Sequence, residues 1–127
     1  DNRGKAGNAG AVEAVVAVMR MHREAEALQV AACALLARIT TDNADNRAKA
    51  GNSGAVEATV VAMRTYREDA ELQQVACDTL GDMTTDNADN RAKAGNAGAV
   101  EAVVAAMCTH REDAELQRAA CMSLFRI

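Results

Sequence analysis

The stretch DAELQQVACDTLGDMTT, Asp69–Thr85, decides the fold. Its apolar side chains recur every three or four residues, which is the spacing of a buried stripe along a helix: Leu72, Ala76, Leu80 and Met83. The side chain of Asp69 can accept hydrogen bonds from the free N–H groups at the start of that helix. The chain carries two further versions of this stretch, Ala25–Thr41 and Asp113–Ile127. Because Ala25 cannot act as a side-chain cap, we expect the first version to fray more at its start.

A shift of 44 residues superimposes the chain on itself without gaps and defines three copies, at 1–44, 45–88 and 89–127. Each copy divides into three helices, which we expect in the middle copy at about 44–52, about 55–66 and from 70 onward. One such triplet cannot bury its apolar face alone, so the copies must stack and share a core. The sequence therefore predicts an all-α fold and a single domain over 1–127.

Residues typical of helix caps and turns lie between the expected helices. We expect Asp42 to cap the first helix of the middle copy and Gly54 to form the turn into the second helix. Gly51 and Gly95 lie within first helices, where glycine costs roughly 1 kcal/mol relative to alanine. The expected reason for keeping glycine there is close contact with a neighbouring helix.

Composition excludes several classes of protein. Half of the residues are apolar, but there is no Trp or Pro and only one Phe and one Tyr, so the core must consist of small and aliphatic side chains. The net charge of −4, with both signs mixed along the chain, argues against nucleic-acid binding, which needs a basic face. No apolar run approaches the roughly 20 residues that cross a bilayer, so we expect no membrane association. The four cysteines fit a reducing compartment, which predicts an intracellular, cytoplasmic location.

The triplet resembles the armadillo repeat, a family whose units have three helices and a period near 42 residues. The second helix of that family begins with a phrase that AGAVEAVV at 97–104 matches in outline. The asparagine that opens the family's first helix is matched by Asn46 and Asn90, and the third-helix pattern is matched in outline by ACDTLGDMT at 76–84. The resemblance covers the whole chain.

The resemblance implies a right-handed α-solenoid of three armadillo-type repeats whose third helices line a concave groove. In much of the family this groove binds extended peptides through a ladder of Trp and Asn side chains. The present chain departs from that ladder in every copy. The Trp positions carry Ala34, Asp78 and Met122, and the Asn positions carry Arg38, Asp82 and Arg126.

The copies differ most where the resemblance places the groove. Between the second and third copies, seven of the 14 positions from Ala70 to Met83 differ, and the large changes follow one face of the third helix. Two alternatives to a binding face remain, namely drift on an exposed surface and an internal charge ladder of Arg38, Asp82 and Arg126. We favour a variable protein-binding face made of Val30, Ala34, Ala37, Arg38, Gln74, Asp78, Gly81, Asp82, Arg118, Met122, Phe125 and Arg126.

No arrangement of residues suggests catalysis, a cofactor or a metal site. Cysteine recurs at one repeated position beside the buried stripe, where core packing explains it best: Cys33, Cys77 and Cys121. Cys108 replaces an arginine and is expected to be more exposed. A ring also recurs near the end of each second helix, where surface or loop packing is the expected role: His22, Tyr66 and His110.

We therefore predict a non-enzymatic module that binds a partner protein or an extended peptide, with a basic segment facing Asp78 and Asp82. The alternative is a structural or self-assembling repeat scaffold, either part of a longer array or engineered, without a dedicated ligand. Leu124 and Ile127 are expected near an uncovered end, which predicts homo-oligomers through the repeat ends. Phe125 is either a binding anchor or a residue that packs against a further repeat.

Overall fold

The computed structural model describes residues 2, 4–5 and 10–127, and within them the regular secondary structure is entirely helical. The first copy contributes α2 (Ala11–Met21) and α3 (Glu26–Thr40). The first helix expected for this copy falls largely on residues 1, 3 and 6–9, outside the described residues. The other two copies each contribute a full triplet: α4 (Ala44–Ser53), α5 (Ala55–Thr65) and α6 (Ala70–Thr84), then α7 (Ala88–Ala97), α8 (Ala99–Thr109) and α9 (Ala114–Arg126).

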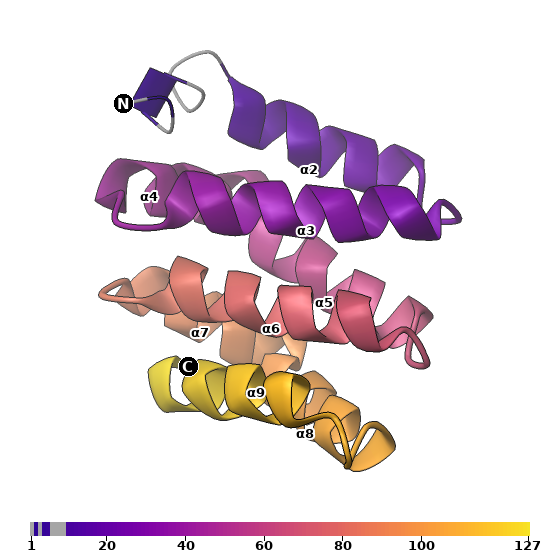
Figure 1. Ribbon diagram of the computed structural model, residues 1–127. Coiled ribbons are helices and arrows are strands. Elements are labelled where there is room, and N and C mark those ends of the chain that lie inside the picture. Colours follow the sequence, from indigo (N-terminus) through magenta and orange to yellow (C-terminus); the bar gives the residue numbers. More distant parts are fainter. Residues whose placement is uncertain (1, 3, 6–9) are drawn as a thin grey trace.

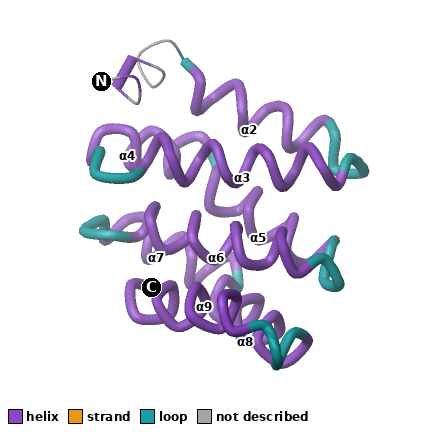
Figure 2. Tube along the Cα trace, viewed as in Figure 1, coloured by secondary structure: helices purple, strands orange, loops and turns teal. Residues whose placement is uncertain are grey.

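The third helices of the three copies, α3, α6 and α9, lie side by side as one row (Figure 1). Helix α6 packs against both α3 and α9, and the shorter helices α4, α5, α7 and α8 lie behind this row (Figure 2). The polypeptide thus follows the same helical path in successive copies. The predicted all-α solenoid is confirmed.

The core lies between the row of third helices and the helices behind it. The predicted stripe on α6 is confirmed, since Leu72, Ala76, Leu80 and Met83 are fully buried. The apolar stripe on α5 is equally buried and consists of Val56, Val60 and Met63. Side chains of adjacent copies therefore form one continuous apolar interior, which no single copy encloses alone.

The helix starts confirm the predicted cap at Asp69 and the predicted lack of one at Ala25, and they correct the cap predicted at Asp42. The side chain of Asp69 accepts a hydrogen bond from the backbone N–H of Leu72, whereas α3 begins at Ala25 without a side-chain cap. The prediction that Asp42 caps α4 is wrong. Asn43 is the cap and accepts from the N–H of Asn46, because Asp42 has a φ of 53° and turns the chain into the helix instead.

The turn predicted at Gly54 and the close helix contact predicted at Gly51 are confirmed, whereas the contact predicted at Gly95 is not. Gly54 has a φ of +88°, in the left-handed region that its turn between α4 and α5 requires. A Cβ atom built on Gly51 would lie 1.9 Å from Oδ1 of Asn90, so the side chain of Asn90 occupies the space that an alanine would fill. A Cβ atom built on the equivalent Gly95 would meet no described atom within 4 Å outside its own helix, so the prediction of a close contact is wrong there.

Equivalent residues of the last two copies differ in burial because, among the described residues, no further copy covers the last one. Val56 is 0% and Val60 is 1% exposed, whereas Val100 and Val104, one copy later, are 40% and 44% exposed. Cys121 is also exposed, so the prediction that it packs in the core is wrong, although it holds for Cys33 and Cys77. Position in the stack, rather than residue type, decides the burial of these side chains.

Candidate functional site

The outer surface of α3, α6 and α9, called here the third-helix face, carries the residues predicted to bind a partner. Those with exposed side chains are Ala34, Arg38, Asp78, Arg118, Met122 and Phe125, and those with half-buried side chains are Val30, Ala37, Gln74, Asp82 and Arg126. Gly81 alone among them is buried. A Cβ atom there would lie 3.6 Å from both Nη1 of Arg126 and Cα of Ser123, because α9 closes over this position.

A hollow of about 250 Å³ opens on this face between the three helices. Most of the predicted residues meet at it, although they are far apart in sequence: Ala37 and Arg38 from α3, Asp78, Gly81 and Asp82 from α6, and Met122 and Arg126 from α9. Thr41, Cys77, Ala119 and Ser123 complete the lining. Val30, Ala34, Gln74, Arg118 and Phe125 do not line the hollow. The face therefore has a centre that all three copies build jointly.

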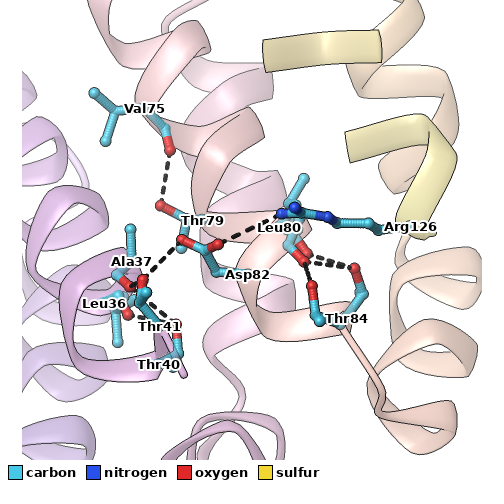
Figure 3. Close-up of polar contacts among 12 residues, drawn as sticks. Leu36, Ala37, Thr40, Thr41, Val75, Thr79, Leu80, Asp82, Thr84 and Arg126 are labelled. Carbon is cyan, nitrogen blue, oxygen red and sulfur yellow. Dashed lines mark hydrogen bonds and ion pairs between the residues drawn. The ribbon is translucent and has the colours of Figure 1, made fainter. Parts of the chain in front are cut away.

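Asp82 is held from both sides by neighbouring copies (Figure 3). Oγ1 of Thr41 donates a hydrogen bond to Oδ2 of Asp82 over 3.3 Å, and Nη1 of Arg126 lies 3.6 Å from Oδ1. Burial raises the pKa of Asp82, and the contacts with Thr41 and Arg126 oppose that rise. One half of the internal charge ladder, the pair of Asp82 and Arg126, is thus confirmed, and Asp82 is already engaged within the chain.

Asp78, one helical turn before Asp82, has a different environment. Its side chain is exposed, and among the described residues no cation lies within ion-pair distance of it. Burial of part of its surface raises the pKa of Asp78, while the positive charges of Arg118 and Arg126 act in the opposite direction. Asp78 is therefore the carboxylate of this face that is available to an incoming cation.

Ser123 adds a polar atom that the sequence reasoning missed. Its side chain is 1% exposed, it lines the hollow, and its Oγ has no hydrogen-bond partner among the described residues. The equivalent Thr79, one copy earlier, donates to the carbonyl of Cys33 over 2.7 Å. A buried hydroxyl without a partner costs about 1–3 kcal/mol, so Ser123 leaves one unmet hydrogen-bonding group in the wall behind the hollow. The change from Thr79 to Ser123 between copies was the signal that could have revealed it.

A family model described as LRRK2 ARM repeat matches residues 5–127. The chain belongs to this armadillo-repeat family. No curated protein and no solved structure gives a significant match. The family is generally a non-catalytic, protein-interaction fold, so the chain is a repeat module of the protein-interaction kind.

Two of the three rings that recur in the armadillo copies, Tyr66 and His110, have the predicted loop-packing role, and the third, His22, lies on the surface. The hydroxyl of Tyr66 donates to the carbonyl of Arg23 in the preceding copy. Nε2 of His110 lies 2.8 Å from the carbonyl of Arg67, which is the same contact one copy later. These side chains therefore tie the loops of neighbouring armadillo copies together.

The described part of the armadillo chain contains no group of three His, Cys, Asp or Glu side chains able to hold a metal ion. None of the described helices is long and apolar enough to cross a membrane. All four cysteines are free thiols. Burial raises the pKa of Cys33 and Cys77 to about 12, which makes these two thiols poor nucleophiles.

Proposed function

We propose that the third-helix face binds an extended segment of a partner protein and that Asp78 receives a basic side chain of that segment. The observation that carries the proposal is the hollow between α3, α6 and α9, which joins residues of all three copies around an available carboxylate. Membership of a protein-interaction family supports a macromolecular partner.

The charges around Asp78 suggest the pattern of the partner. Arg38 on α3 and Arg126 on α9 flank the acidic middle, so the face alternates positive, negative and positive along the row of helices. Packed helices lie about 8–10 Å apart, and an extended chain advances about 3.3 Å per residue. A complementary segment would therefore place one charge about every three residues, in the order acidic, basic, acidic.

A synthetic peptide with the pattern Glu-x-x-Lys-x-x-Glu, with Ser and Gly between the charges, is a probe for this proposal. We expect it to bind the wild-type chain and to shift backbone resonances along α3, α6 and α9. Asp78→Asn should weaken binding at least tenfold, which corresponds to about 1.4 kcal/mol. Asp82→Asn should have a smaller effect, because Arg126 and Thr41 already occupy that carboxylate.

Two controls separate this proposal from nonspecific charge attraction. The reversed peptide, Lys-x-x-Glu-x-x-Lys, should bind more weakly than the probe peptide. Glu57→Gln removes one negative charge from the exposed surface of α5 and should leave binding unchanged. Failure of the probe peptide to bind, or an equal loss of binding in Glu57→Gln and Asp78→Asn, would contradict the proposal.

A further inference from the structure

Two equivalent hollows lie between the second helices of successive copies, one between α2 and α5 and the other between α5 and α8. They have volumes of about 170 Å³ and about 90 Å³. Every residue that lines the first hollow has a counterpart 44 positions later that lines the second. None of these residues lines the hollow on the third-helix face. The chain therefore has a second recessed surface, built by a different row of helices.

Each of these second-helix hollows is edged by two arginines and one glutamate, all with exposed side chains. They are Arg20, Arg23 and Glu57 in the first hollow, and Arg64, Arg67 and Glu101 in the second. Among the described residues, none of these six side chains takes part in an ion pair. Each hollow thus carries one more positive than negative charge, although the whole chain has a net charge of −4. An anionic group is the ligand that complements this excess.

The two arginines of a hollow are engaged to different degrees. Nη2 of Arg64 donates to the carbonyl of Ala97 over 3.0 Å, which fixes this guanidinium at the end of α7. Arg67 donates only through Nε, to the carbonyl of Arg64 over 3.3 Å, and both of its Nη groups lack a partner among the described residues. A guanidinium offers paired N–H donors that match a carboxylate. Arg67, and Arg23 one copy earlier, therefore supply the donors that are most available to a ligand.

The floor of each hollow is apolar. Met63, Ala102 and Ala106 line the second hollow and are buried, and the first hollow has Met19 and Ala62 at equivalent positions. An apolar floor beside arginine donors suits a glutamate side chain, because its methylene groups can cover the floor while its carboxylate accepts the hydrogen bonds. A small inorganic anion would leave the floor uncovered. The hollows therefore favour the acidic side chain of a protein over a free anion.

We propose that the two second-helix hollows bind two glutamate side chains of an extended, acidic segment of a partner protein. Helix α5 packs against both α2 and α8, and packed helices lie about 8–10 Å apart. An extended chain advances about 3.3 Å per residue, so glutamates in the pattern Glu-x-x-Glu reach both hollows. Membership of a protein-interaction family supports a macromolecular partner. This surface is separate from the third-helix face, and the two proposals do not depend on each other.

A synthetic peptide with the pattern Glu-x-x-Glu, blocked at both ends and with Ser and Gly between the glutamates, tests this proposal. We expect it to shift the backbone resonances of α2, α5 and α8 more than those of α3, α6 and α9. The double variant Arg23→Gln/Arg67→Gln should weaken binding at least tenfold, because each hollow loses its more available guanidinium. The variant should remain folded, since both side chains are exposed and Tyr66 and His110 contact only the backbone carbonyls of these residues.

A matched control is available at the same repeat position of the last copy. Arg111 is exposed and its Nε donates to the carbonyl of Cys108, as Arg67 does to Arg64, but it lines neither hollow. Arg67→Gln alone should weaken binding several-fold, whereas Arg111→Gln should leave it unchanged. A Gln-x-x-Gln peptide should not bind. Absence of binding by the glutamate peptide, shifts confined to the third-helix face, equal losses in Arg67→Gln and Arg111→Gln, or equal binding of the glutamine peptide would each overturn the proposal.

Discussion

Leu80→Ala should lower the free energy of unfolding by about 2–5 kcal/mol, the usual cost of removing a large side chain from a closed core. Leu80 is fully buried between the row of third helices and the helices behind it, so neighbouring side chains cannot collapse fully into the space. The loss affects more than one copy because α6 packs against both α3 and α9. Urea unfolding followed by circular dichroism measures the change.

Leu124→Ala is the matched control for this substitution. Leu124 occupies the same repeat position in the last copy, but its side chain is only half-buried. We expect less than half of the effect of Leu80→Ala, since part of its surface already contacts solvent. Equal losses at the two positions would contradict the view that neighbouring copies close the core.

Gly51→Ala should lower the free energy of unfolding by about 2–3 kcal/mol, although alanine is the better helix former. The new methyl group would lie 1.9 Å from Oδ1 of Asn90. Asn90 cannot move aside cheaply, because its Nδ2 donates to the carbonyls of both Arg47 and Met83 and its side chain is 1% exposed. Relief of the clash therefore breaks buried hydrogen bonds between copies.

Gly95→Ala, at the same repeat position, should change the free energy of unfolding in the opposite direction. At concentrations where the chain is a monomer, it should raise the free energy of unfolding by roughly 0.5–1 kcal/mol, because a glycine within a helix is replaced where nothing is displaced. Thermal unfolding of both variants gives the comparison. A loss of stability in Gly95→Ala, or no loss in Gly51→Ala, would show that the side chain of Asn90 does not fill the space beside Gly51.

The fold was predictable because the repeat, the apolar pattern and the helix cap all indicate the same structure. The 44-residue shift gave the copies, the apolar stripe on α6 gave the buried surface, and Asp69 gave the helix start. The choice between Asp42 and Asn43 as the cap was not predictable, since both residue types cap helices and both tolerate the left-handed region. The capping and backbone propensities of Asp and Asn are too similar to show which of these two adjacent residues is the cap.

The candidate site was predictable in part. Differences between copies located the residues that meet at the hollow, but they did not show that Asp82 is engaged and Asp78 is available. That distinction depends on Arg126, which reaches Asp82 from another copy.

The buried Gln73 was also missed. Its Nε2 donates to the carbonyls of Met63 and Tyr66 and completes the end of α5, a role indicated only by the glutamine that recurs in every copy.

The reactivity of the cysteines tests directly whether neighbouring copies cover each other, because one repeated position carries a thiol in every copy. Cys33 and Cys77 are 0% exposed, and Cys121 is exposed in the last copy. Burial raises the pKa of both buried thiols to about 12, so at pH 8 almost none of either is present as the reactive thiolate. The folded chain should therefore react with a maleimide at Cys121, and at the exposed Cys108, long before Cys33 and Cys77 do.

Mass spectrometry after timed labelling of the native chain distinguishes the four sites, and labelling in urea shows that all four can react. We predict fast modification of Cys108 and Cys121, and protection of Cys33 and Cys77 until the chain unfolds. If Cys77 were labelled as fast as Cys121 in the folded chain, neighbouring copies would not cover each other, and the stacked architecture described here would be contradicted.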